Sequence, residues 1–235
     1  MDFSVVIDNI GFYAEGVKNT VILTSVALLI GLVLAIPLAV LRTIAKPLIT
    51  IPIRAFVYFF RGTPLLIQMY LIYYGLGQFD WMKESLLWPF FKEAYFCALL
   101  AFSLNTCAYT VEILRGAIVA TVEGEIEAAK ACGMSRLLML RRIVLPSAFR
   151  RALPAYSNEI IFMLHGTALA SVITIVDITG AARIVNSRNY SPYEAFLTAA
   201  ALYMVLTFTI IFFVRRVEKR WHAHLHPAEY KEAEM

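Results

Sequence analysis

Five long stretches of the chain contain no Asp, Glu, Lys or Arg, and they dominate its hydrophobic pattern. They are 23, 18, 18, 17 and 20 residues long and cover Asn19–Leu41, Gly62–Phe79, Ala94–Val111, Ile160–Val176 and Ala195–Val214. At ~1.5 Å per residue, a helix of each length crosses most of a hydrocarbon core of ~30 Å. Because backbone groups at that depth must bond within a helix or a closed barrel, the pattern predicts an all-α membrane protein with five transmembrane helices.

Basic residues between these stretches predict the orientation. With the N-terminus outside, 15 Lys and Arg fall in the inside segments and 5 in the outside segments. The inside segments are 42–54, 112–159 and 215–235, and the outside segments are 1–18, 80–93 and 177–194. Since cytoplasmic loops carry the excess of Lys and Arg, we expect an outside N-terminus and an inside C-terminus. The first basic residue is Lys18, so no signal peptide is expected.

Two spans contain residues that interrupt helices. The second stretch extends backwards through Ala55–Phe60 across Arg61-Gly62-Thr63-Pro64, which predicts a break near its cytoplasmic end. Gly31 and Pro37 permit a kink in the first span.

The segment between the last two spans predicts short outer elements. Asp177–Asn189 alternates apolar and basic residues, as in a short interfacial helix. Ser191-Pro192-Tyr193-Glu194 has the spacing of a capping box with Pro at the first helical position, which predicts the start of the fifth span.

Composition agrees with a membrane protein and narrows the chemistry. Hydrophobic residues make up 60% of the 235 residues and charged residues 16%, against about 45–50% and about 25% in soluble domains. The net charge of +4 follows from the loop bias, so it does not indicate nucleic acid. The three cysteines, Cys97, Cys107 and Cys132, have no paired spacing, which argues against disulfides and metal knuckles.

The longest inside segment has the features of a rigid projection. We expect a short helix over Glu123–Cys132, a left-handed C-terminal cap at Gly133, a second helix capped by Ser135, and an end to that helix at Pro146. Two short helices joined at a glycine suit docking to another protein. The alternative is an ordinary basic loop that follows the membrane surface.

The spacing in this segment favours docking. Glu127-Ala128-Ala129 is followed by three residues, Gly133, nine residues and the sequence Ile143-Val144-Leu145-Pro146. This pattern resembles the EAA coupling motif of permease subunits of ATP-binding cassette (ABC) importers, with Leu145 and Pro146 at its end.

Further motifs extend the resemblance along nearly the whole chain. The sequence from Phe60 to Gln68, FRGTPLLIQ, is similar to the second-span motif of the polar amino acid permeases. The sequences LNTCAYTVEI (104–113) and LPAYSNE (153–159) resemble most the M-type subunit of histidine/lysine/arginine/ornithine transporters. Opine permeases are near relatives of that group, so the family is better defined than its ligand.

The resemblance implies a type I importer with the MetI-like permease fold in the bacterial inner membrane. Residues 1–235 then form one transmembrane permease domain, with the coupling loop at 120–146 and a cytoplasmic tail at 215–235. The implied partners are a second permease subunit, favoured as a paralogue, two copies of an ATP-binding subunit, a periplasmic amino-acid-binding protein and membrane lipid. No cofactor is expected on this chain, because it lacks G-x-x-x-x-G-K-[ST]; ATP and Mg would be bound by the partner ATPase.

Two acidic residues border the apolar stretches. Glu112 lies three residues before Arg115, so an ion pair at the inner interface is expected. Glu159 has Phe162 and Met163 at the corresponding positions and lies ~12 Å from Arg151 along a helix, close to the bilayer midplane. Because a charge at that depth costs roughly 2.5–3.5 kcal/mol, Glu159 is expected to face a cavity or a partner.

The resemblance adds a substrate path. In related amino acid permeases the S-N-E acid and the segment after it line the substrate cavity, which implies the path residues Glu159, His165, Gly166, Thr167 and Leu169. Several relatives carry Asp at the position of Gly166, so either this subunit or its partner could hold the main site. Gly166 and Thr167 would also let the helix open, while His165 is expected to be a hydrogen-bonded packing residue.

Other functions fit the sequence less well. A proton-coupled secondary transporter is a second hypothesis, but no repeat is visible and only one deep acid lacks a partner. A membrane enzyme is third, and no nucleophile and base pair supports it. His222, His224 and His226 could hold a metal, although a solvated tail is the favoured interpretation.

Overall fold

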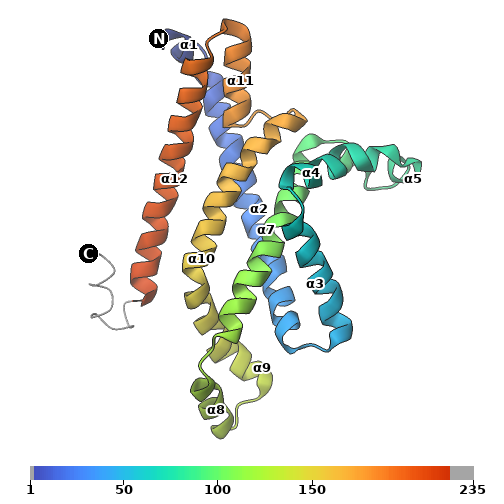
Figure 1. Cartoon of the computed structure of the whole chain (residues 1–235), viewed down its shortest axis with the longest axis vertical. Helices are drawn as coiled ribbons and strands as arrows, with labels where there is room; N and C mark the ends of the chain where they lie inside the picture. The colour runs from blue at the N-terminus through green and yellow to red at the C-terminus, as the bar shows by residue number, and fades with distance from the viewer. Residues whose placement is uncertain (1–2, 223–235) are drawn as a thin grey trace.

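The computed structural model describes residues 3–222, in which all regular secondary structure is helical. The long helices α2, α7, α10 and α12 run along the long axis of the molecule, while a set of short helices forms an arm on one side (Figure 1). The α-helices are α1 (Ser4–Asp8), α2 (Ile10–Ile44), α3 (Pro47–Gly62), α4 (Leu65–Tyr70), α5 (Asp80–Lys83), α6 (Trp88–Phe91), α7 (Ala94–Val119), α8 (Glu123–Ala131), α9 (Arg136–Met139), α10 (Leu145–Gly166), α11 (Ile178–Asn189) and α12 (Pro192–His222). Two π-helical turns, η1 (Leu71–Gly75) and η3 (Leu140–Val144), and two 3-10 helices, η2 (Leu76–Gln78) and η4 (Thr167–Ile173), complete the set.

The spans match the predicted hydrophobic pattern in part. Among the described residues, three straight helices are long and apolar enough to cross a membrane: α2, α7 and α12. Two bent pairs bring the number to five if each is one span. One pair is α3 with Leu65–Gln78, bent by 106°, and the other is Arg136–Ile173 with α11, bent by 45°.

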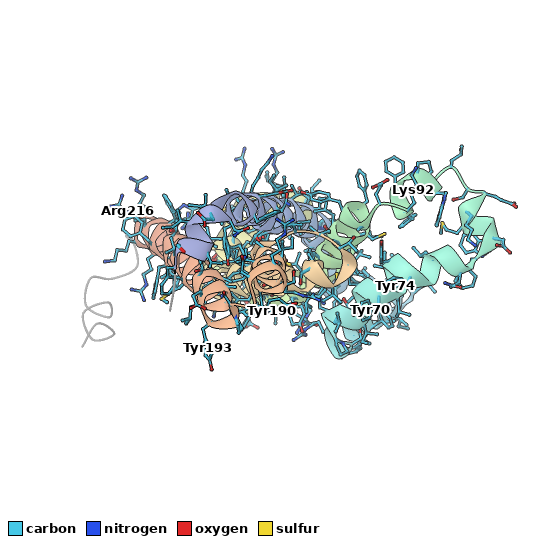
Figure 2. The ribbon with its side chains drawn as sticks, turned by 90° about the horizontal axis from the view of Figure 1, so that it is seen from above. Tyr70, Tyr74, Lys92, Tyr190, Tyr193 and Arg216 are labelled. Atoms are coloured by element: carbon cyan, nitrogen blue, oxygen red, sulfur yellow. The ribbon has the colours of Figure 1, made fainter. Side chains whose placement is uncertain are left out.

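The predicted break in the second span is present, but it is larger than a kink. Thr63 is extended, with φ −115° and ψ 145°, because the residue before a proline is pushed out of the helical region. Pro64 also lacks an N–H for the helix. The chain after Pro64 therefore leaves the direction of α3 and starts the arm, so Gly62–Phe79 is not one straight span as the hydrophobic stretch suggested. Figure 2 shows Tyr70 and Tyr74 on this arm and Lys92 where the chain returns to α7.

Helix α7 is the centre of the bundle and packs on α2, α3, α4 and α10. Its contact with α2 is unusually close at Gly31: a Cβ added there would lie 2.3 Å from Cγ2 of Thr106 and 3.2 Å from the backbone N of Cys107. Small residues let helices in membranes approach in this way. Helix α2 runs unbroken through Pro37. The short distance to Thr106 indicates that Gly31 serves close packing.

Three apolar clusters follow one another along the bundle, and alanines are prominent in all of them. The first joins α2, α3, α7 and the start of α10, and the second joins α2, α4, α7 and the end of α10. The third joins α2, α11 and α12 around Tyr13 and Val185. Because the apolar face of α11 is buried in this third cluster, the helix expected at Asp177–Asn189 forms but packs inside the protein.

Asp177 fixes the start of α11. Its carboxylate is fully buried and accepts hydrogen bonds from the backbone N–H groups of Gly180 and Thr179, at 2.9 and 3.1 Å. The hydroxyl of Tyr203 on α12 donates to the same carboxylate at 2.9 Å. This side chain is therefore both the N-cap of α11 and a link between α11 and α12.

Candidate functional site

A buried polar network holds the break between α3 and α4. Since Pro64 has no N–H, the carbonyl oxygen of Phe60 loses its helical donor. The side-chain amide of Gln68 donates to that oxygen at 2.8 Å, and the amide of Asn105 on α7 donates to it at 3.3 Å. Asn105 also donates to Oε1 of Gln68 at 3.0 Å. Gln68 and Asn105 are buried, so this part of the FRGTPLLIQ motif stabilises the bend.

Glu159 lies beside this network, on α10. Its side chain is only 6% exposed, and its Oε1 accepts a hydrogen bond from the hydroxyl of Thr106 at 2.7 Å. No ion pair with Glu159 is present in the described residues. The residue lines a cavity of about 310 Å³ together with Leu65, Asn105, Tyr109, Phe162 and Met163. As the sequence predicted, the acid faces a cavity, which three helices form.

A cationic side chain packs on one of the residues that line the same cavity. The guanidinium of Arg61 stacks on the ring of Tyr109, with 5.2 Å from Cζ to the ring centroid. Tyr109 lines the cavity that contains Glu159, so this guanidinium lies one side chain away from the cavity, outside its lining. From the sequence, Arg61 was expected only as part of a helix break. Its position as a single charged residue within an otherwise charge-free stretch could have indicated a functional role.

The other residues implied for the substrate path occupy different surroundings. Gly166 ends α10, and a Cβ there would lie 3.2 Å from Cδ2 of Leu65, which lines the cavity. Thr167 is buried and donates to the carbonyl of Leu164 at 2.6 Å, and Leu169 packs on the second apolar cluster. The helix tightens into η4 at Thr167, and the chain leaves helical geometry only at Thr174, with φ +71°. The structure therefore places Gly166 beside a residue that lines the cavity, but it places Thr167 in the core and Leu169 against it.

His165 points to α12. Its Nε2 lies 3.1 Å from Oγ1 of Thr207, and its ring packs edge-on against Tyr203 at 6.3 Å between centroids. These contacts agree with the expected packing role of this histidine.

Glu112 forms a larger ion cluster than the predicted pair. Arg115 donates from Nε to Glu112 at 3.0 Å, as expected, and Arg42 on α2 donates to the other carboxylate oxygen. A guanidinium nitrogen of Arg61 lies 4.0 Å from the same oxygen. Glu112 thus connects α2, α3 and α7 close to the cavity.

The predicted projection is present at the end of the molecule opposite α1 and α11 (Figure 1). Helix α8 contains Glu127, Ala128 and Ala129, and Gly133 follows it with φ +73°. The hydroxyl of Ser135 accepts from the N–H of Leu138 at 3.4 Å and caps α9. Glu127 and Ala128 are exposed and Ala129 is buried, so one face of α8 is free and the other is fixed to the protein.

The predicted helix end at Pro146 is wrong. Helix α9 passes through the π-helical turn η3 directly into α10, and Pro146 lies in the first turn of α10. Proline is tolerated in the first turn of α10, where its fixed φ suits the helix. The second helix of the projection and the span with Glu159 are therefore continuous.

Arg151 connects the projection to α10. Its guanidinium donates to the carbonyl oxygen of Ala117, at the end of α7, at 3.1 and 3.2 Å. The same group donates to Thr121 at 2.8 Å and to Ser147 at 2.7 Å. It thus satisfies a carbonyl left free at the helix end and fixes the base of α8 to α10.

No metal cluster of His, Cys, Asp and Glu occurs in the part of the chain that the structure describes. Of the three tail histidines that could hold a metal, His222, His224 and His226, the last two lie outside the described residues.

Comparison with curated proteins gives close relatives among amino acid and opine permeases. The histidine/lysine/arginine/ornithine transport system permease protein HisM of Escherichia coli (strain K12) is 46% identical over 219 residues, which is 93% of this chain and 92% of HisM. The octopine transport system permease protein OccM of Rhizobium meliloti is 48% identical over 193 residues, 82% of this chain and 79% of OccM. The nopaline transport system permease protein NocM of Agrobacterium fabrum is 44% identical over 226 residues, 96% and 94% of the two chains.

Solved structures and a family model agree. A chain in the crystal structure of an amino acid ABC transporter with histidines is 32% identical, with a TM-score of 0.83 over 94% of this chain and 99% of that one. A chain of the MetNI methionine ABC transporter shares the fold, at 18% identity, with a TM-score of 0.72 over 90% and 97%. Residues 27–223 match the family model described as binding-protein-dependent transport system inner membrane component. The chain therefore belongs to this family of multi-pass inner membrane proteins, as a polar amino acid permease of an ABC importer and not as its ATPase.

Proposed function

We propose that this permease forms part of the translocation path for basic amino acids: histidine, arginine, lysine and ornithine. The observation that carries the proposal is the buried carboxylate of Glu159, which borders a cavity and has one hydroxyl donor, Thr106. A carboxyl group with so few protein partners in a membrane span suits a cationic ligand.

Glu159 in the cavity and Arg61, which stacks on the lining residue Tyr109, suit the two ends of an amino acid. Glu159 would attract the cationic side chain or the α-ammonium group, and Arg61 would attract the α-carboxylate. Guanidinium groups pair with carboxylates in a bidentate geometry, which favours Arg61 for that role. Gly166 would leave room beside Leu65, while His165, Thr167 and Leu169 would support the α10–η4 segment.

We also propose that residues 120–146 dock on a cytoplasmic ATPase subunit. The exposed residues Glu127 and Ala128, the turn at Gly133, and the segment through Leu145 and Pro146 would form the contact. Arg151 supports a mechanical link, because it joins the base of this projection to the helix that carries Glu159. Movement of the projection would then reach the cavity through α10.

The complete importer would contain a second permease subunit, favoured as a paralogue, two ATPase subunits that bind ATP and Mg, and a periplasmic amino-acid-binding protein. The family supports the ATPase and the binding protein. The 15-to-5 division of basic residues supports an outside N-terminus and an inside tail at 215–235. An ABC permease family also argues against the secondary transporter and enzyme hypotheses.

The test is the substitution Glu159→Gln, which keeps the shape and removes the charge. Two unit charges 4 Å apart attract by about 4 kcal/mol at an effective dielectric constant of ~20 but by ~1 kcal/mol in water. We expect arginine and histidine uptake by the assembled importer to fall by at least about tenfold, while assembly and basal ATPase activity are retained. Glu84→Gln, on the exposed part of the arm, is the matched control. Normal uptake in Glu159→Gln would place recognition elsewhere.

Opines are the second candidate substrates, because OccM and NocM are as similar to this chain as HisM is. Uptake of radiolabelled arginine in competition with octopine distinguishes them. Stronger inhibition by octopine than by unlabelled arginine would favour the opine.

A further inference from the structure

A basic groove lies between the first turns of α10 and the last turns of α12. Its volume is about 450 Å³, and it is lined by Arg150, Phe149 and Pro146 from α10 and by Arg220 and Trp221 from α12. The side chains of Arg150 and Arg220 are exposed and make no hydrogen bond or ion pair with any residue among 3–222. No described carboxylate lines this hollow, so it offers two guanidinium groups to an anion.

The same two helices form a second hollow further along their length. It measures about 350 Å³, and its lining is mixed. Ile161, Ile210, Ile211 and Val214 form the apolar part, and Pro154, Ser157, Asn158, Arg215 and Glu218 complete it. Along α12, Trp221 and Ile210 are 11 residues apart, about 16 Å at 1.5 Å per residue. A molecule with an anionic end and a long apolar chain would fit both hollows. We name the two together the α10–α12 groove.

The charge around the basic end is strongly positive. Arg150 and the segment 215–220 carry five cationic side chains against one carboxylate, a net charge of +4. Arg216 lies over the ring of Phe212, with 4.5 Å from Cζ to the centroid, and Figure 2 shows it at the edge of the bundle opposite the arm. Basic pockets between transmembrane helices on the cytoplasmic side bind anionic headgroups, and tryptophan is enriched at the membrane interface.

The wall of the groove is exposed on the surface of this chain. Only 6% of the apolar window of α12 is buried inside the chain, against 67% for α7. The groove's basic end lies toward the end of the molecule that carries α8 and α9, which is the end with the excess of Lys and Arg (Figure 1).

We propose that the α10–α12 groove binds an anionic phospholipid of the inner leaflet. Arg150 and Arg220 would hold the phosphate, Trp221 would lie at the level of the headgroup, and an acyl chain would lie along Ile210, Ile211 and Val214. The lipid would thereby brace α12 against the helix that joins the projection to Glu159. Its binding is independent of which amino acid the importer carries.

The test compares the delipidated, assembled importer with and without added dioleoyl-phosphatidylglycerol. We expect this lipid to raise the midpoint of thermal unfolding by roughly 5 °C, whereas phosphatidylcholine and inorganic phosphate leave it unchanged. The double substitution Arg150→Gln/Arg220→Gln should abolish the shift, and Arg150→Lys/Arg220→Lys should retain most of it. Lys83→Gln/Lys92→Gln, on the arm, removes the same charge and should leave the shift intact.

Three results would overturn the proposal. The first is an equal shift in Arg150→Gln/Arg220→Gln, and the second is the same shift with inorganic phosphate, which would indicate a free-anion site. The third is efficient crosslinking of Ile211→Cys to the second permease subunit, because that subunit would then fill the groove. If the double variant does not assemble, Arg220→Gln alone decides by the size of its shift.

Discussion

The contact between α2 and α7 at Gly31 provides the sharpest test of the packing. In Gly31→Ala the new Cβ would lie 2.3 Å from Cγ2 of Thr106. This is roughly 1.2–1.7 Å less than the ~3.5–4.0 Å separation of non-bonded carbon atoms. The backbone of α7 also lies only 3.2 Å from the new Cβ, so the methyl group does not fit unless α2, α7 or the Thr106 side chain moves.

Two responses are open to the protein, and both are costly. The helices can separate, which has the cost of overpacking, ~1–3 kcal/mol. Alternatively, Thr106 can rotate to another χ1 rotamer, which moves its hydroxyl away from Glu159 and breaks the 2.7 Å hydrogen bond. A buried polar group left without its hydrogen-bond partner costs ~1–3 kcal/mol, so the second response is no cheaper.

We therefore expect Gly31→Ala to lower the free energy of unfolding by about 2 kcal/mol. For a chain of this size, this corresponds to a fall of roughly 4–8 °C in the midpoint of thermal unfolding. The assay is thermal unfolding of the purified importer, followed by uptake at a temperature where both variants are folded. Gly11→Ala is the control on the same helix, because no atom lies within 4 Å of a Cβ there. Equal midpoints for the two variants would refute the close packing of α2 on α7.

Three further predictions concern other parts of the chain. Gly133→Val should reduce transport and substrate-stimulated ATPase activity, because a β-branched residue is strained at φ +73°. The control is Gly124→Val in α8, which should retain more activity; a Cβ at either position meets no atom within 4 Å. Wild-type activity in Gly133→Val would contradict the docking model. Ala228→Cys, in a chain without its native cysteines, should resist an impermeant thiol reagent applied outside sealed cells, and labelling there would contradict the inside tail. Asp177→Ala should lower the unfolding midpoint more than Asp80→Ala does, because it removes a buried N-cap that accepts from three donors. Loss of an N-cap costs ~0.5–2 kcal/mol. An equal effect of the two substitutions would show that this cap contributes little.

The importance of Glu159 could be inferred from the sequence, but its surroundings could not. A carboxylate in an apolar stretch with no partner at helical spacing must find one elsewhere or face a cavity, and this argument needs only the sequence. The donor Thr106 and the guanidinium of Arg61 lie 53 and 98 residues away along the chain. Only the packing of α7 against both α3 and α10 brings such distant side chains into one region.

Local chemistry determined the long helices and the turns of this protein. Charge-free stretches gave the positions of α2, α7 and α12, since no other backbone structure satisfies its polar groups in lipid. Likewise, the positive φ of Gly133 and the cap at Ser135 depend on neighbouring residues alone. The 106° bend after α3 and the continuity of η3 with α10 were decided by tertiary structure. A proline specifies that a hydrogen bond is missing, but where the chain goes next depends on which side chains satisfy the freed carbonyl, and at Phe60 these include Asn105, from another helix.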